Sequence, residues 1–239
     1  MQKSHKYTFE SRIRFSEADH TEKITLPGII NYFQDCSIFQ SESIGLGLDY
    51  LSEKKRAWVL SSWQVEVERY PRLGEEIRVS TWATDFKGIL GSRNFSMESP
   101  EGEMLAYANS LWVYMDMEKG RPVKPEQMEI ERYGTDRALE MEELSRKVKL
   151  PQGAEKCPEF PVRKYHIDTN EHVNNCQYVQ MAMEMLEGDR EIKRLRAEYK
   201  KSAVYKDRIV PYVVRGEDDT TVGLCDTNGQ AYAVIEFKF

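Results

Sequence analysis

Two kinds of hydrophobic pattern alternate along the chain, and each occurs twice. Residues 29–46 have apolar side chains, among them Ile29, Phe33 and Cys36, at the spacing of a helix with one buried face. Residues 174–188 show the same period, which again predicts a helix with one apolar face. The rest of the apolar residues fall largely into runs that alternate with polar ones, as half-buried strands do.

Strand-like runs flank both predicted helices. In the first half, turn signals rich in proline and glycine separate these runs, which are residues 7–15, 57–69, 75–86, 91–99 and 103–117. In the second half, a short extended run precedes the helix and further strand-like runs follow it, at residues 160–167, 196–204, 208–217, 220–226 and 230–239. An Asn228-Gly229 pair indicates a hairpin turn between the last two runs.

The order of strand, turn, helix and antiparallel strands therefore appears twice, which predicts an internal repeat. Residues 16–24 can be laid on residues 165–173 so that Asp19 matches Asp168. Residues 70–77 and 204–209 also agree in position and in turn chemistry. We expect each half to be a sheet wrapped around one central helix.

Between the two halves, the sequence becomes rich in proline and charge. Prolines recur from residue 122 to residue 161, and the charged stretch 126–149 is compatible with a surface helix. We read this part as a linker. The predicted organisation is an N-terminal domain at residues 1–120, a linker at 121–160 and a C-terminal domain at 161–239.

Composition narrows the function classes. With 239 residues, 40% of them hydrophobic and 11% aromatic, the chain can bury a sizeable core. A net charge of −6 argues against sequence-independent nucleic-acid binding, which neutralises phosphates with Lys and Arg. We see neither a secretory signal nor an apolar run long enough to span a membrane. The four cysteines form no CxxC pair, so we expect no zinc site, no disulfide framework and a cytoplasmic location.

The stretch HIDTNEHVNN, residues 166–175, carries the candidate chemistry. One reading is a polar loop that caps the next helix, with Asn174 as the N-cap residue. The other is an active site, because alternate residues of an extended segment point the same way and Asp168, Asn170 and His172 would then converge. They would do so just before a helix N-terminus, whose backbone N–H groups can bind an oxyanion.

The first half of the chain lacks this polar set. In the register that matches Asp19 with Asp168, Thr21 stands in place of Asn170 and Lys23 in place of His172. In a duplicated enzyme with a single active site, one copy would keep the catalytic residues and the other copy would have lost them. This contrast favours the active-site reading over a purely structural turn.

The pattern D-x-N-x-H followed by V-N-N-x-x-Y resembles the acyl-acyl-carrier-protein (acyl-ACP) thioesterases, bacterial relatives of the plant enzymes that end fatty-acid synthesis. Residues 58–77 and 198–209 also resemble segments of that family, so the likeness covers nearly the whole chain. The resemblance implies an α+β fold with two tandem hotdog domains, a double hotdog in one chain. That fold agrees with the repeat inferred from the patterns.

The resemblance also implies a reaction, the hydrolysis of the thioester between a fatty acyl chain and the phosphopantetheine arm of acyl carrier protein. His172 would be the general base or would position the attacking water, and Asn170 would hold the water or the thioester carbonyl. Asp168 would orient and tune the site, with a direct nucleophilic role as the alternative. Asn174 and Asn175 would lie beside the substrate. No metal and no organic cofactor is implied.

One departure from the family concerns a fourth catalytic position. Where the plant enzymes carry a Glu-Cys pair, this chain has Ser202-Ala203, so the thiol is absent and the carboxylate is missing. Ser202 is a candidate polar helper, and Glu198 is a candidate replacement if both lie on one face of a regular strand. We expect Cys176 to be a small buried hydrophobe rather than a nucleophile, and His166 to be structural.

The resemblance further implies a cavity for the acyl chain and a docking surface for the carrier protein. We expect the first half to hold the acyl chain, with candidate lining residues Phe33, Phe39, Ile44, Trp58, Leu60, Trp63 and Trp82. Acyl carrier protein is acidic, so docking requires a basic surface. The candidates, all within the basic stretch 190–208, are Arg190, Lys193, Arg194, Arg196, Lys200 and Lys201.

Rival functions remain open. An acyl-CoA thioesterase would use the same fold with a different carrier. A hotdog dehydratase would pair its histidine with an acid, which the Asn-x-His pattern disfavours. A non-catalytic acyl-binding protein is the third possibility, because of the Ser202-Ala203 departure. Tandem domains allow either a monomer or a homodimer.

Overall fold

The structure, a computed structural model, describes residues 4–239. The chain divides into two compact units. The first comprises the residues up to Ser61 together with Val65–Glu143, and the second comprises Ser62–Gln64 and Leu144–Phe239. No helix among the described residues has the length and apolarity needed to span a lipid bilayer.

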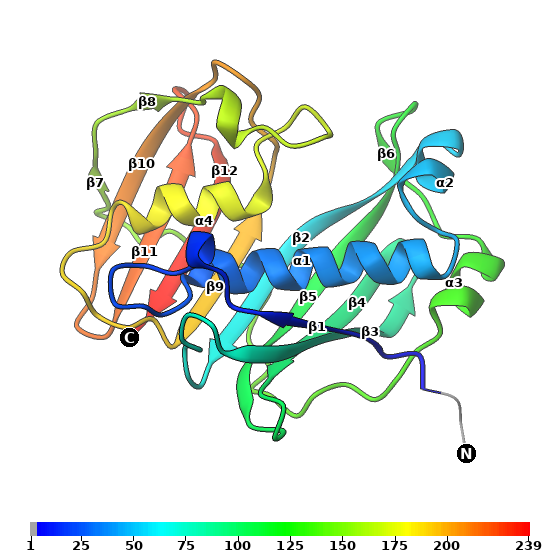
Figure 1. Ribbon diagram of the computed structural model, residues 1–239. Helices are drawn as coiled ribbons and strands as arrows, with labels where there is room; N and C mark the ends of the chain where they lie inside the picture. Colours follow the sequence, from blue (N-terminus) through cyan, green and yellow to red (C-terminus); the bar gives the residue numbers. More distant parts are fainter. Residues whose placement is uncertain (1–3) are drawn as a thin grey trace. The chain divides into compact units, whose positions relative to one another are not determined.

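The first unit is an antiparallel sheet with one long helix across it (Figure 1). Its strand order is β1-β3-β4-β5-β2, and a short strand β6 pairs with β5. The strands are β1 (Tyr7–Arg12), β2 (Arg56–Val67), β3 (Glu76–Lys87), β4 (Leu90–Glu98), β5 (Met104–Asp116) and β6 (Arg121–Pro122). The helices are α1 (Leu26–Ser43), α2 (Leu48–Glu53), α3 (Gln127–Tyr133) and the 3-10 turn η1 (Phe15–Glu17).

Helix α1 forms where the period of apolar residues predicts it, and it begins three residues earlier than expected. Thr25 is its N-cap, and the Thr25 hydroxyl accepts a hydrogen bond from the Gly28 N–H at 3.1 Å. The predicted face is confirmed, because Ile29, Phe33 and Cys36 are fully buried. The Phe33 ring packs on Phe95 of the sheet, with ring centroids 5.3 Å apart.

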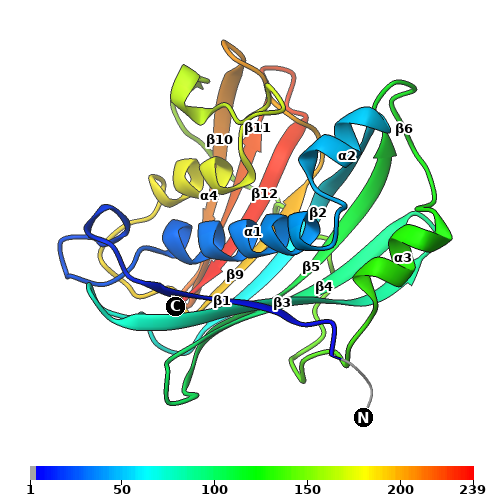
Figure 2. The same ribbon diagram turned by 45° about the vertical axis from the view of Figure 1, so that its right-hand side comes forward.

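The second unit repeats this arrangement with fewer residues (Figure 2). Its strand order is β9-β12-β11-β10-β7, and β8 also pairs with β10. The strands are β7 (Glu155–Lys156), β8 (Phe160–Pro161), β9 (Arg194–Tyr199), β10 (Arg208–Arg215), β11 (Asp219–Cys225) and β12 (Ala231–Lys238). Helix α4 (Asn175–Met183) follows the 3-10 turn η2 (Lys164–His166).

The two sheets have the same connectivity. In each unit, the first long strand after the helix lies at one edge of the sheet, next to the last strand. The second long strand lies toward the other edge, next to the short segment that precedes the helix. Each unit is thus a hotdog, a sheet with one helix across it, and the predicted double hotdog fold is confirmed.

Irregular chain covers the face of each sheet that is turned away from its helix. In the first unit, the Asp136 N–H donates to the Ala83 carbonyl at 3.0 Å, and the Trp82 indole N–H donates to the Arg137 carbonyl at 2.9 Å. In the second unit, the Val148 N–H donates to the Glu198 carboxylate at 3.0 Å. The helix suggested for 126–149 is therefore wrong beyond Tyr133, where α3 ends. The remaining chain satisfies its backbone groups on the sheets instead.

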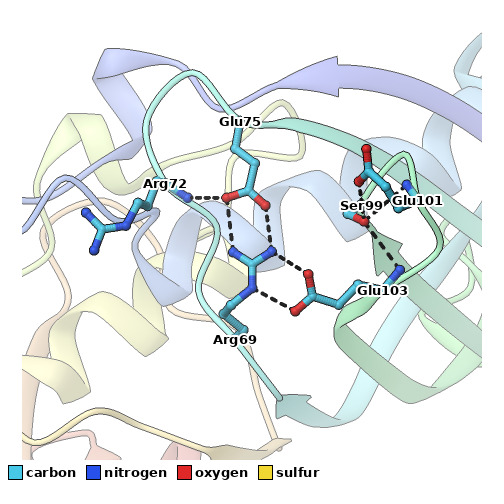
Figure 3. Close-up of polar contacts among 6 residues, drawn as sticks. All are labelled: Arg69, Arg72, Glu75, Ser99, Glu101 and Glu103. Carbon is cyan, nitrogen blue, oxygen red and sulfur yellow. Dashed lines mark hydrogen bonds and ion pairs between the residues drawn. The ribbon is translucent and has the colours of Figure 1, made fainter.

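Arg69 joins two loops at one end of the first sheet (Figure 3). Its guanidinium donates to the Glu75 carboxylate at 2.7 and 3.0 Å and to the Glu103 carboxylate at 2.7 and 2.8 Å. The hydrogen bonds from Arg69 lower the pKa of Glu75, which partial burial alone would raise.

A pH-dependent loss of stability is expected for Glu75→Gln. Because the pKa of Glu75 is lower in the folded state, its ionised form stabilises the fold above the unfolded-state pKa of about 4.3. This contribution disappears as the pH falls through the folded-state pKa. After allowance for solvent screening, we expect a loss of about 1 kcal/mol at pH 7 and almost none at pH 3, measured by urea denaturation. Glu101→Gln is the control, because Glu101 lies on the neighbouring loop and forms no ion pair within residues 4–239; it should not show the loss at pH 7. Equal losses at both pH values for Glu75→Gln would contradict the assignment.

Candidate active site

The motif at 166–175 folds as a hydrogen-bonded turn ahead of α4. The Asp168 N–H donates to the His172 carbonyl at 2.8 Å, and the Asn170 N–H donates to the Asp168 carboxylate at 2.8 Å. Glu171 has a positive φ of 62°, so the chain reverses there. The expected extended segment is therefore wrong. A turn, rather than strand alternation, sets the directions of Asn170 and His172.

The first unit makes the same turn. The Asp19 N–H donates to the Lys23 carbonyl at 2.9 Å, and the Thr21 N–H donates to the Asp19 carboxylate at 2.8 Å. Glu22 also has a φ of 62°. Burial alone would raise the pKa of Asp19, but hydrogen bonds from Thr21 outweigh it and lower that pKa. The predicted register between the halves is thus confirmed, bond by bond, and the two copies differ in their side chains.

Several polar side chains of the motif make no hydrogen bond within residues 4–239, among them the predicted site residues Asn170, His172 and Asn175. Asn170 is exposed and His172 is half-buried, and neither side chain makes a hydrogen bond within residues 4–239. By contrast, the Asn174 side chain accepts from the Cys176 N–H at 2.8 Å, which confirms Asn174 as the N-cap of α4. The Asn175 carbonyl accepts from the Tyr199 hydroxyl at 3.1 Å. The side chains of Asn170 and His172 in the turn, and of Asn175 at the start of α4, are therefore available to a substrate.

The loop that follows β9 lies directly against the motif. The Val173 N–H donates to the Ala203 carbonyl at 2.9 Å, and the Ala203 N–H donates to the Tyr178 hydroxyl at 2.7 Å. Ser202 is exposed, and it precedes Ala203 in the loop that is bonded to the motif. The structure thus brings the predicted fourth position to the motif, and Ser202 stays a candidate helper.

Tyr178 positions this loop, a role that the sequence patterns alone did not reveal. It is 2% exposed, and burial, with smaller effects of Asp207 and Asp168, raises its pKa. A neutral phenol beneath Ala203 holds the loop against α4 without adding charge. The only signal in the sequence is the tyrosine of the V-N-N-x-x-Y pattern.

Glu198 does not fit the role of replacement carboxylate. β9 ends at Tyr199, so Ser202 lies outside the strand, and the premise of a shared strand face is wrong. The Tyr199 hydroxyl reaches α4, so its neighbour Glu198 points to the opposite face of the sheet. There its carboxylate accepts from the Val148 N–H at 3.0 Å and pairs with Lys200 at 2.9 Å.

Two residues near the motif are structural, as expected. Cys176 is 1% exposed, and burial raises its pKa to about 12, so it is not a thiolate near neutral pH. His166 is 7% exposed, and its Nδ1 accepts from the Arg163 N–H at 2.9 Å. Burial, followed by the charge of Arg163, lowers the pKa of His166 and keeps it neutral.

The predicted acyl-lining residues are not gathered in one place. Phe33 and Leu60 belong to the core, whereas Phe39 is 43% exposed and contacts Phe9 at its edge. Trp82 lies on the face of β3 away from α1, under the segment that contains Arg137. Trp63 is buried and is assigned to the second unit.

Among the predicted acyl-lining residues, Trp58 is surrounded by three aromatic side chains. Its ring lies 4.6 Å from Tyr114 and 6.0 Å from Phe86, and Tyr133 adds an edge contact at 6.5 Å. Ile44 packs at the same end of α1, against the cluster around Tyr133. The acyl site in the first unit stays a prediction.

Most of the predicted docking cations are neutralised. Carboxylates outside the stretch 190–208 supply several partners, which a count of charges along the sequence could not include. The pairs are Arg190 with Asp218 at 3.6 Å, Arg196 with Glu236 at 2.9 Å and Lys201 with Asp226 at 2.5 Å. Lys200 pairs with Glu198, and Lys193 and Arg194 are the remaining members. Arg196 also donates to the Ser145 carbonyl at 2.6 Å, so it is part of the fold and not a free surface charge.

Two hotdog units in one chain place this protein in the class of double-hotdog proteins. Residues 4–133 match the profile of the acyl-ACP thioesterase N-terminal domain, and residues 150–237 match that of the acyl-ACP thioesterase C-terminal domain. The chain therefore belongs to the acyl-ACP thioesterase family, as the sequence motifs suggested.

Curated relatives come from plants. The chain is 31% identical over 183 residues to the chloroplastic acyl-[acyl-carrier-protein] hydrolase FATB2 of Cuphea viscosissima, a match that covers 70% of this chain and 43% of that protein. It is 28% identical over 228 residues to the chloroplastic palmitoyl-acyl carrier protein thioesterase of Gossypium hirsutum, over 87% of this chain and 54% of the relative. The chain thus spans about half the length of these relatives.

Solved structures share the fold over the whole chain. An acyl-ACP thioesterase from Bacteroides thetaiotaomicron superimposes with a TM-score of 0.89 at 20% identity, covering 98% of each chain. The 12:0-ACP thioesterase from Umbellularia californica gives a TM-score of 0.87 at 21% identity, covering 100% of this chain and 98% of the other. At this level of identity, the agreement establishes the double hotdog fold.

Proposed function

We propose that this protein hydrolyses the thioester of fatty acyl-ACP and releases a free fatty acid, which ends chain elongation. The observation that carries the proposal is the contrast between two identical turns. In the turn before α4, the side chains of Asn170 and His172 make no hydrogen bond within residues 4–239. The turn before α1 carries Thr21 and Lys23 at these positions. Membership of the acyl-ACP thioesterase family supports the assignment.

In the proposed reaction, His172 takes a proton from water as the water oxygen attacks the thioester carbonyl. Backbone N–H groups at the start of α4 and the Asn170 amide stabilise the negative charge that develops on the carbonyl oxygen. When the tetrahedral intermediate collapses, the carbon–sulfur bond breaks and the imidazolium returns the proton to the leaving thiolate. The products are a fatty acid and the free thiol of the pantetheine arm. Asp168 holds the turn through its bond to the Asn170 N–H, which sets the distance between the two working side chains.

The protein's compartment is proposed on the state of its thiols. No disulfide joins any of the four cysteines within residues 4–239, and Cys36, Cys176 and Cys225 are buried within their units. Burial raises the pKa of Cys36 to about 12, which makes this thiol unreactive. Free cysteines are characteristic of a reducing environment, so we propose a cytoplasmic location.

The test compares one acyl chain on two carriers. Purified protein is given palmitoyl or octanoyl groups on acyl carrier protein and on CoA, and free thiol release is followed. We expect kcat/KM to be at least about tenfold higher on the carrier protein, because only that carrier adds protein contacts. Equal values on CoA would favour an acyl-CoA thioesterase, and no thiol release from either carrier would contradict the proposed hydrolysis. Fatty-acid profiling of a bacterial host that expresses the protein would then give the chain length.

A further inference from the structure

A basic hollow lies on the second unit, where the turn η2 meets the loop between β9 and β10. Its volume is about 360 Å³. Four of its residues are cations and two are tyrosines; the lining consists of Pro161, Val162, Arg163, Lys164, Tyr165, Tyr205, Lys206 and Arg208. None of these residues has a role in the proposed hydrolysis.

The same two loops occur in the first unit without this charge. The Ile13 N–H donates to the Glu75 carbonyl at 2.9 Å, as the Val162 N–H donates to the Asp207 carbonyl at 2.8 Å. When the two units are aligned in this way, Lys164 corresponds to Phe15, and Lys206 corresponds to Gly74. The first-unit loops, 14–17 and 72–76, contain two arginines and three glutamates, whereas 163–166 and 204–208 contain four Lys or Arg residues and one aspartate.

The cations of the hollow are largely unneutralised. Among residues 4–239, Arg163, Lys164 and Lys206 form no ion pair, and Arg208 makes an exposed pair with Glu159 at 2.6 Å. In the first unit, by contrast, Arg14 pairs with Glu17, and His166 stands in the place of that glutamate. Replacing the acid by a neutral histidine leaves the charge of Arg163 available.

Aromatic rings lie between these cations. The ammonium of Lys206 is 5.4 Å from the centre of the Tyr205 ring, and that of Lys164 is 6.0 Å from it. Tyr165 is 78% exposed. Exposed tyrosine beside Arg and Lys is the composition of a protein-binding surface, because such rings bury area at little cost in conformational entropy.

Lys206 has an unusual backbone conformation for its residue type. Its φ is 76°, and the matching Gly74 has a φ of 81°. A left-handed conformation disfavours residues with a Cβ by about 1–2 kcal/mol, so glycine is the better residue for the turn. A lysine in this place contributes a charged side chain to the hollow rather than stability to the turn.

A second hollow, of about 410 Å³, adjoins the first and shares Pro161, Arg163 and Tyr165 with it. It runs along α4 and is lined in part by Met181 and Met185. Methionine side chains adapt to irregular partners. The two hollows together offer cations next to apolar surface, and Glu184 is the acidic residue of their lining.

We propose that the basic hollow docks the acidic carrier protein that delivers the acyl chain, in place of the neutralised set at 190–201. This inference rests on the proposed function. Both loops of the hollow continue into the candidate active site. Residues 163–166 lead directly into the motif, and the 204–206 loop follows Ala203, whose carbonyl accepts a hydrogen bond from the Val173 N–H. A carrier held there would have its arm beside His172. With a net charge of −6, the chain repels polyanions in general, so a local basic surface selects a partner of matching shape and charge.

The test copies the first unit into the second. The double variant Lys164→Phe/Lys206→Gly introduces the residues that the first unit has at the corresponding positions, Phe15 and Gly74. Since these residues already form the same pair of loops there, the fold should tolerate them. We expect the KM for acyl-ACP to rise about tenfold at low salt with little change in kcat. The KM for S-acyl-pantetheine, which lacks the protein, should not change. The control Lys87→Gln/Lys149→Gln also removes two exposed lysines and should behave as wild type.

A direct binding measurement keeps this test independent of turnover. Isothermal titration with holo carrier protein should show binding to wild type that weakens about tenfold in the double variant. Unchanged affinity and KM would overturn the docking surface, as would a KM that rises equally for S-acyl-pantetheine. If wild type binds the carrier but releases no thiol, the proposed hydrolysis is wrong and the docking surface stands; absent binding contradicts the dock.

Discussion

Replacing His172 by alanine should lower kcat for acyl-ACP hydrolysis by about 10²–10⁴-fold, the usual contribution of a general base. The imidazole is half-buried and has no hydrogen-bond partner among the described residues, so its removal leaves no buried polar group unpaired. We therefore expect the KM and the midpoint of thermal unfolding to change little. Steady-state kinetics with acyl-ACP and a thermal melt of the same preparation measure both.

The chain provides its own control for this variant. Lys23 occupies the position of His172 in the identical turn of the first unit, and its carbonyl accepts from the Asp19 N–H as that of His172 accepts from Asp168. Lys23→Ala should therefore reproduce any effect on the turn itself and leave kcat unchanged. A His172→Ala protein that hydrolyses acyl-ACP as fast as wild type would exclude His172 as the base. Equal losses in the two variants would mean that the turn, and not the imidazole, matters.

The sequence was sufficient for the fold because two independent signals agree. The helical period around Ile29 and Phe33 and the strand alternation around Ile77 and Val79 reappear in the same order in the second half. Matching Asp19 with Asp168 is correct because an aspartate that accepts from the N–H two residues later fixes a turn locally. Local chemistry of this kind can be read from neighbouring residues.

The same local chemistry explains the main error about the motif. Strand alternation predicts that Asp168, Asn170 and His172 point the same way, but the Asp168 carboxylate accepts from the Asn170 N–H and Glu171 takes a positive φ, so the chain turns. The polar residues are near one another because the chain makes a hydrogen-bonded turn, and not because alternate residues of a strand share a face. A pattern of every second residue does not by itself distinguish a strand from a turn of this kind.

Other parts of the site depend on contacts far apart in the sequence. Glu198 is not available to the motif, because the Val148 N–H, fifty residues away in the sequence, donates to its carboxylate. Arg196 and Lys201 are predicted docking cations, but Glu236 neutralises Arg196 across the neighbouring strands β9 and β12, and Asp226, just after β11, neutralises Lys201. Irregular segments carry no period, so their contacts with a sheet cannot be predicted from hydrophobic pattern.

The second large effect is expected for Asp168→Ala, which should lower kcat by about 10²-fold or more. The carboxylate receives the Asn170 N–H at 2.8 Å, and without it the two working side chains lose their fixed spacing. Misplacement of reacting groups by about 1 Å is enough for a loss of this size. We also expect a loss of about 1 kcal/mol in unfolding free energy, the typical worth of such a hydrogen bond.

Asp19 separates the two effects, since it makes the same turn in the first unit without the catalytic side chains. Asp19→Ala should cost at least as much stability as Asp168→Ala, because both remove the acceptor of one turn and Asp19 also accepts from the Thr21 hydroxyl at 2.6 Å. It should leave kcat unchanged. Urea denaturation and kinetics on the three proteins, wild type included, give the comparison. A fall in kcat for Asp19→Ala would show that the first copy of the turn still takes part in the reaction.

Asp168→Asn decides between positioning and carboxylate chemistry. Asparagine keeps an oxygen that can accept from the Asn170 N–H, so the turn and most of the stability should persist. If Asp168 acts by holding the turn, kcat should fall only about tenfold, because the geometry remains and only the negative charge beside His172 is lost. If the carboxylate attacks the thioester itself, Asp168→Asn should be as inactive as Asp168→Ala while remaining folded. The position of its oxygen on the Asn170 N–H favours the first result, since a carboxylate that caps its own turn is held in place by the backbone and not directed at a carbonyl carbon.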